Sequence, residues 1–129
     1  MFYDPKWDKK VKELEKQDEW RAVLLKAAKI LEEKGWVQQS FAKRGSYCII
    51  GAINKAIGRH PSNDDLNRGK NQPLFNEVVS RLEERIPRQR SWGNFGYYQG
   101  AAKIESWNDD ERRTKEQVLK TLRDCAIKG

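Results

Sequence analysis

The sequence is poor in the residues that hold metals and form disulfides. Its 129 residues include two cysteines, Cys48 and Cys125, and one histidine, His60. A zinc site uses four clustered cysteine or histidine ligands, so this chain offers a poor set and we expect no metal site. Two cysteines without a secretory context are typical of a reducing compartment. We therefore expect two free thiols and a cytoplasmic protein.

Long apolar runs are also absent. The longest is the stretch YCIIGAI, residues 47–53, far short of the about 20 apolar residues that cross a bilayer. The first ten residues, MFYDPKWDKK, carry two aspartates and no apolar segment, so we do not expect a signal peptide. These absences argue against a membrane partner.

The common cofactor-binding signatures are missing too. The sequence has no GxxxxGK[ST] phosphate-binding loop, no GxGxxG turn and no zinc-deaminase signature, so we expect no cofactor. Carboxylates gather in ESWNDDE, residues 105–111, but charged residues ahead of a helix usually serve its dipole. A glycosidase needs two carboxylates at a fixed separation in contrasting environments, and this pattern does not predict one.

Positive charge, in contrast, is plentiful and unevenly spread. The formal net charge is +7, from 26 Lys and Arg against 19 Asp and Glu. Residues 36–103 hold 11 basic and 5 acidic residues, whereas the two flanking segments are nearly balanced. Such an excess favours an anionic partner, either nucleic acid or an acidic protein surface. Ordinary solubilising charge is the alternative interpretation.

Apolar residues recur with helical spacing along most of the chain. The clearest stripe, at i, i+3, i+4, i+7, i+8 and i+11, consists of Trp20, Val23, Leu24, Ala27, Ala28 and Leu31. With stop signals at Gly35, Gly58 and Pro87, the pattern predicts helices over residues 6–16, 18–34, 46–58, 74–86 and 114–126. We expect a mainly α protein, a compact bundle of about five helices in one domain over residues 1–129. A long irregular aromatic-basic loop precedes the last helix, which opens with the capping-box pair Thr114 and Gln117.

The most apolar stretch, RGSYCIIGAINKAIG (residues 44–58), raises the question whether Cys48 reacts or packs. With Ser46 as the helix cap, Cys48 would lie in the first turn, where free amides and the helix dipole lower the pKa of a thiol. His60 follows the far end of this helix, and about ten residues at about 1.5 Å each would hold thiol and imidazole about 15 Å apart. Proton transfer needs about 3 Å. Since Cys48 also aligns with small residues of the buried stripe, we expect both cysteines to be buried and inert.

A second unusual stretch, RIPRQRSWGNFGYY (residues 85–98), interleaves arginines with aromatic residues. Arginines neutralise phosphates and flat rings stack on unstacked bases, so this composition is typical of proteins that bind single strands or loops. The same residue types dominate protein–protein hot spots, and the rings can instead complete a thin core. The candidate binding residues, including a basic pair upstream, are Lys43, Arg44, Arg85, Arg88, Arg90, Trp92, Phe95, Tyr97 and Tyr98.

Three elements of the chain resemble a family of small uncharacterised bacterial and phage domains. They are AAKILEEKGWVQQSFA, YCIIGAI and SWNDDERRTKEQVLKTLRDCA, within residues 22–126. The pattern Gly-Trp, Cys-x-x-Gly-Ala, Trp-Asn-Asp and Arg-Thr is carried by Gly35, Trp36, Cys48, Gly51, Ala52, Trp107, Asn108, Asp109, Arg113 and Thr114. The resemblance implies a fold and no established activity. This chain departs from the pattern over residues 88–103, which are longer than usual.

The Trp-Asn-Asp element has an architectural interpretation that needs no ligand. Trp107 would close the core and Asn108 would cap a turn. Asp109 would pair with Arg112 or Arg113 before the last helix begins.

Together these features predict a non-enzymatic basic binding module that engages nucleic acid or a nucleoprotein complex. A phage or mobile-element accessory protein that interferes with a host system would fit the size and the resemblance. Two alternatives stay open, a thiol-dependent enzyme that uses Cys48 and a protein–protein adaptor.

Overall fold

The computed structural model describes residues 18–61, 71–91 and 96–129. In these ranges the chain forms five helices and one small antiparallel sheet, which confirms the expected mainly α fold. In chain order the elements are α2 (Glu19–Lys34), β1 (Ala42–Lys43), β2 (Ser46–Tyr47), α3 (Ile49–Ile57), α4 (Gln72–Glu83), α5 (Gly100–Asn108) and α6 (Lys115–Lys128). The predicted helix over 6–16 lies outside the described residues. None of the helices in the described part is both long and apolar enough to cross a membrane.

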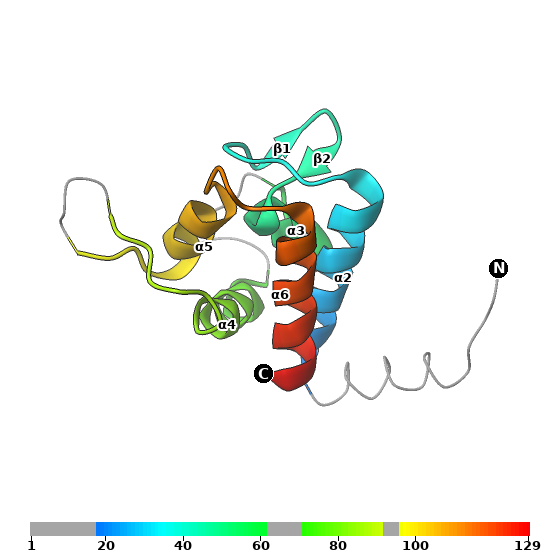
Figure 1. The fold of residues 1–129 in the computed structure, drawn as a ribbon. Coiled ribbons are helices and arrows are strands. Elements are labelled where there is room, and N and C mark those ends of the chain that lie inside the picture. The colour runs from blue at the N-terminus through cyan, green and yellow to red at the C-terminus, as the bar shows by residue number, and fades with distance from the viewer. Residues whose placement is uncertain (1–17, 62–70, 92–95) are drawn as a thin grey trace.

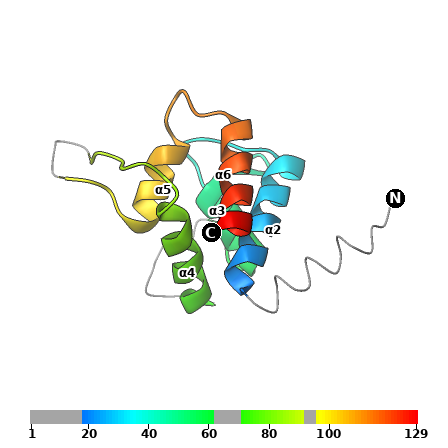
Figure 2. The same ribbon diagram turned by 60° about the horizontal axis from the view of Figure 1, so that its bottom comes forward.

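The core forms where α2 meets α6 and α3. Helices α2 and α6 lie side by side in both views (Figures 1 and 2), and α3 packs against α2 as well. The predicted stripe of α2 is confirmed, because all six of its residues are buried. Each fully buried leucine in such a core contributes about 1.5–3 kcal/mol of transfer free energy, so this stripe is a main source of stability.

The limits of the later helices agree with the sequence to within a few residues. Helix α4 begins at Gln72 and ends at Glu83, earlier than predicted at both ends, although Ile86 beyond it is still buried. Helix α6 begins with the expected capping box. The Thr114 hydroxyl accepts from the Gln117 amide at 3.2 Å, and the Gln117 side chain accepts from the Thr114 amide at 3.1 Å.

The two short strands form a hairpin over the start of α3. Lys43 pairs with Ser46 across a two-residue turn whose members, Arg44 and Gly45, have φ of 52° and 82°. Two consecutive positive φ values are typical of a type I′ turn, which matches the twist of the strands.

A helix occupies part of the segment that was expected to be irregular. Helix α5 covers residues 100–108 and buries Ala101, Ile104 and Trp107 together with Asn108. Its start has no side-chain cap of its own, and instead the Gly100 amide donates to the Glu83 carboxylate of α4 at 2.7 Å. The prediction of an irregular loop was wrong here because the apolar stripe is short and the cap comes from a distant residue.

Candidate functional site

The chain between α4 and α5 forms an arm, defined here as residues 87–91 and 96–99. Arg90 and Tyr97 form an antiparallel bridge, and the Tyr98 amide donates to the Gln89 carbonyl at 2.8 Å. Next to them the Ser91 amide donates to the Gly96 carbonyl at 2.9 Å. In both views the arm extends beyond α4 and α5, away from α2 and α6 (Figures 1 and 2). Backbone pairing therefore holds these residues together outside the helical core.

The arm brings cationic and aromatic side chains together. The Arg88 guanidinium carbon lies 5.2 Å from the centroid of the Tyr97 ring, a cation–π distance. Tyr97 is 51% exposed, and Arg88 and Arg90 are exposed as well. Residues 85–98 contain three arginines and no acidic residue. The sequence-based clustering of Arg88, Arg90 and Tyr97 is thus present, with half-buried Tyr98 beside them.

The other candidate binding residues are not all part of this cluster. Lys43 and Arg44 are exposed at the β1–β2 hairpin, which lies at the top of Figure 1 and well away from the arm at its left. Arg85 is exposed at the end of α4 and faces α6. The pKa of Asp124 there is lowered mainly by a hydrogen bond from Lys120 and to a smaller extent by the charge of Arg85. Trp92 and Phe95 lie outside the described residues.

Cys48 occupies a different position in its helix from the one predicted. It is the N-cap of α3, and its sulfur accepts from the Gly51 amide at 3.3 Å. The prediction of Ser46 as the cap was wrong because Ser46 belongs to β2, and its hydroxyl donates to the Lys34 carbonyl at the end of α2 at 2.8 Å. The strand delays the helix start by two residues, so the thiol caps the helix instead of joining its apolar stripe.

The environment of Cys48 disfavours the thiolate. The side chain is 4% exposed, and burial raises the pKa of the thiol from 9.0 to about 11. Hydrogen bonds from the Gly51 and Ile50 amides lower this pKa less, and the negative charges of Glu105 and Asp109 raise it further. The predicted burial of both cysteines is confirmed, since Cys125 is 1% exposed and donates to the Arg81 carbonyl at 3.5 Å.

Helix α3 separates Cys48 from His60, as expected. Its nine residues lie between the two, which corresponds to about 14 Å at about 1.5 Å per residue. His60 is exposed beyond the end of the helix. The two side chains are therefore not arranged as an acid–base pair.

Asn108 connects three parts of the fold. Its side-chain oxygen accepts from the Trp36 indole at 2.8 Å and from the Ile49 amide at 3.1 Å. Its side-chain nitrogen donates to the Val37 carbonyl at 3.2 Å and to the Asp109 carboxylate at 2.9 Å. The side chain is 1% exposed, so a single amide joins the end of α5, the chain after α2 and the start of α3. This role is wider than the turn cap that the sequence suggested.

The neighbours of Asn108 differ in part from the predicted arrangement. Trp107 is buried, as expected, and Arg113 covers its ring at 3.9 Å while donating to its carbonyl at 2.9 Å. Asp109, however, accepts from the Gln39 amide at 2.7 Å and pairs with neither arginine. The ion pair to Arg113 comes from Asp110, at 3.9 Å. The prediction for Asp109 was wrong because this carboxylate accepts from a backbone amide in the loop after α2 instead.

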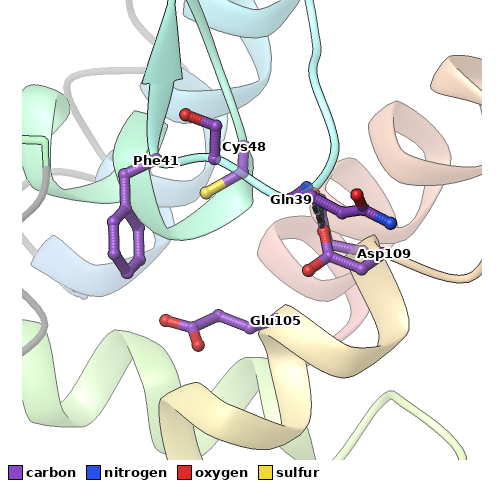
Figure 3. A pocket seen from close by; sticks show the side chains of 7 residues that line it. Gln39, Phe41, Cys48, Glu105 and Asp109 are labelled. Atoms are coloured by element: carbon purple, nitrogen blue, oxygen red, sulfur yellow. Dashed lines mark hydrogen bonds between the residues drawn. The ribbon is translucent and has the colours of Figure 1, made fainter.

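These contacts form one side of a pocket of about 420 Å³. Within the described ranges its walls come from the loop after α2, the start of α3 and the end of α5, with the lining residues Gln39, Ser40, Phe41, Cys48, Glu105, Asn108 and Asp109. Figure 3 shows the Cys48 sulfur, the Phe41 ring and the Glu105 carboxylate around the same space. Composition gave no signal for Gln39, Phe41 or Glu105 as a group, because they meet only in the fold. All three elements of the resemblance reach this region, because the first contains residues 39–41 and the other two contain Cys48, Asn108 and Asp109.

No three His, Cys, Asp or Glu side chains among the described residues are arranged to hold a metal ion. The described lining offers a thiol, a hydroxyl, two carboxylates, two side-chain amides and an aromatic ring.

Comparison with known proteins identifies a family and no relative of known activity. The model of a family described as "Family of unknown function (DUF6197)" matches residues 15–128. No curated protein and no solved structure matches the chain. The family match confirms the resemblance to an uncharacterised family of small domains.

Proposed function

Because the chain belongs to a family of unknown function, DUF6197, its role has to be argued from its own residues, and we propose that it is a non-enzymatic binding module for single-stranded nucleic acid, bound alone or within a nucleoprotein complex. The arm makes the contact. Arg88 and Arg90 neutralise phosphates, and Tyr97 stacks on an unstacked base.

The observation that carries this proposal is the exposed Arg88–Tyr97 pair on an arm without carboxylates. The ring is half exposed and the guanidinium lies 5.2 Å from its centroid, so the pair presents a flat surface with a positive charge. Stacking of a base on an aromatic ring is worth about 1–3 kcal/mol and tolerates any base sequence. Each arginine–phosphate contact adds a term that weakens with salt.

The thiol-dependent alternative has less support. Cys48 is buried, its pKa is raised to about 11, and His60 lies beyond the other end of α3. Reactive cysteines instead have a lowered pKa and partial exposure. Two free, buried thiols are in keeping with a reducing compartment, and a cytoplasmic location is part of our proposal. A phage or mobile-element accessory protein that acts on a host nucleoprotein complex is the biological setting that we propose.

Binding can be measured by fluorescence anisotropy with labelled oligo(dT) and oligo(rU), and with a duplex of the same length as a comparison. We expect the single strands to bind and the affinity to fall steeply between about 50 and 200 mM salt, because counterions are released. Arg88→Gln/Arg90→Gln should weaken binding about tenfold and reduce the slope of log K against log salt by about 1.4, the value for two lost contacts to a single strand.

Two further variants make the experiment specific for the arm. Lys43→Gln/Arg44→Gln removes the same charge from the β1–β2 hairpin, and we expect it to change the affinity by less than about twofold. Tyr97→Leu should weaken binding about fivefold or more while leaving the salt slope unchanged, since it removes stacking and no charge. Absence of binding to either single strand, or equal effects of the arm and hairpin double variants, would refute the proposal. The protein–protein adaptor would then be the better hypothesis.

A further inference from the structure

The pocket beside Cys48 has the geometry of a small-molecule site. Its volume of about 420 Å³ falls within the range of small-molecule sites, which is about 300–1,000 Å³. Three separate segments of the described chain line it, and the hydrogen bonds of Asn108 hold these segments together. The packing of these segments therefore shapes the pocket, and none of its described lining residues belongs to the arm.

The walls contain polar groups whose hydrogen-bonding capacity the protein does not use. The Cys48 side chain is 4% exposed and points into the pocket (Figure 3), yet its S–H group donates to no acceptor among the described residues. The hydrogen bonds to Asp109 from Gln39 and Asn108 both end on Oδ1, and Oδ2 accepts none within the described part of the chain. A buried thiol proton and a carboxylate oxygen are thus available to a ligand.

The described part of the wall differs in charge from the protein as a whole. The chain carries a net charge of +7, whereas the lining residues that the structure describes include two carboxylates, Glu105 and Asp109, and no lysine or arginine among them. Both carboxylates are close enough to Cys48 to raise the pKa of its thiol, which shows that their charges act on the pocket interior. Phe41 adds a ring face, and ring faces attract cations.

From this combination we propose that the pocket binds a small organic cation, with its charge between the Glu105 and Asp109 carboxylates and its apolar body against the Phe41 ring. A planar guanidinium group suits such walls, because it donates to two carboxylates at once and stacks on a ring. The Cys48 side chain forms part of the wall beside the ligand, and its S–H group makes no hydrogen bond to it because a guanidinium has no acceptor. This site is independent of the arm and of nucleic-acid binding.

Two backbone amides that donate to lining side chains report on the occupancy of the pocket in NMR spectra. The Gln39 amide donates to Asp109, and the Gly51 amide donates to the Cys48 sulfur. We expect both amide signals to shift in a saturable way when the full chain is titrated with n-butylguanidinium up to about 20 mM, a range suited to millimolar affinity. Neutral n-butanol and anionic pentanoate, which carry the same butyl chain, should shift them far less.

Charge-neutral variants test the recognition itself. Glu105→Gln and Asp109→Asn keep the shape and the accepting oxygen, and each should weaken n-butylguanidinium binding about fivefold. Glu111→Gln removes the same charge from an exposed residue outside the pocket, and should change the affinity by less than about twofold. Thermal melting checks that each variant is folded, and Phe41→Leu supplies a third wall variant. Absence of shifts, equal shifts with butanol, or equal effects of the wall variants and Glu111→Gln would overturn the proposal.

Discussion

Replacing Asn108 by alanine tests whether this residue holds the fold together. The side chain is 1% exposed and makes four hydrogen bonds, to the Trp36 indole, the Ile49 amide, the Val37 carbonyl and the Asp109 carboxylate. Alanine leaves these four partners in place and removes the group that joins them. Three of them belong to the chain after α2 and the start of α3, so the loss affects several elements at once.

The size of the effect follows from the partners that are left without a hydrogen bond. A buried donor or acceptor that loses its partner costs about 1–3 kcal/mol. The Trp36 indole, the Ile49 amide and the Val37 carbonyl all lose one, and water entering from the adjacent pocket recovers part of the cost. We expect a loss of about 3–5 kcal/mol, a large share of the about 5–15 kcal/mol of a typical domain. For a chain of this length that corresponds to a melting temperature lower by about 12–20 °C.

Urea denaturation followed by circular dichroism measures this loss, with Asn76→Ala as the control. Asn76 is exposed on α4 and accepts a single hydrogen bond, from Gln72, so its replacement should cost less than about 1 kcal/mol. Trp36→Phe removes the indole donor and also reduces the size of the ring. The packing loss is present in both backgrounds, so its cost should be about 1 kcal/mol larger in the native chain than beside Asn108→Ala, the contribution of the lost hydrogen bond. Equal, small losses for Asn108→Ala and Asn76→Ala would refute the reasoning, as would additive effects of the two core variants.

Three further predictions concern other parts of the structure. Burial raises the pKa of Cys48 from 9.0 to about 11, so folding favours the thiol, and its contribution to stability is complete below about pH 9 and lost as the pH rises towards about 11. Cys48→Ala should flatten the fall of the urea midpoint across that window, and identical pH profiles would contradict this assignment. Gly51→Ala would place its Cβ against the Phe41 carbonyl oxygen, too close for the backbone to stay where it is, and should cost about 3 kcal/mol or more. Gly58→Ala, at a φ of 92° in open space, should cost only about 1 kcal/mol, and equal melting temperatures would contradict the difference. Arg113→Met keeps the side-chain stem but loses the contacts to the Trp107 ring and carbonyl, so we expect a loss of about 1–2 kcal/mol in urea denaturation. An unchanged midpoint would show that those contacts are neutral.

Local pattern predicted most of the helices. The stripe of α2, the core of α3 and the capping box of α6 are encoded within one segment each, so periodicity and capping residues were enough to find them. Helix α5 was missed because its apolar stripe is short and because its first amide, of Gly100, donates to the Glu83 carboxylate of another helix. The cap of α3 was misplaced for a similar reason, since pairing with β1 draws Ser46 into a strand.

The same distinction, between features encoded within one segment and features that need distant segments, applies to the candidate sites. Composition found Arg88, Arg90 and Tyr97, because they are close in sequence and backbone pairing keeps them close in space. It also grouped Lys43 and Arg44 with them, but the fold places that pair at the β1–β2 hairpin, away from the arm. The pocket had no compositional signal, because its walls come from segments far apart in the chain.

The sequence by itself determined the helical class, the buried stripes, the burial of both thiols and the basic, aromatic character of the arm. Each of these depends on neighbours within a few residues, where periodicity and side-chain chemistry act directly. Only the tertiary structure decided that Asn108 joins three segments, that Cys48 caps its helix, and that Glu105 and Asp109 line the same pocket as Cys48 and Phe41. Those features arise from hydrogen bonds and packing between residues distant in the chain, and a pattern within one segment carries no information about which distant segment will meet it.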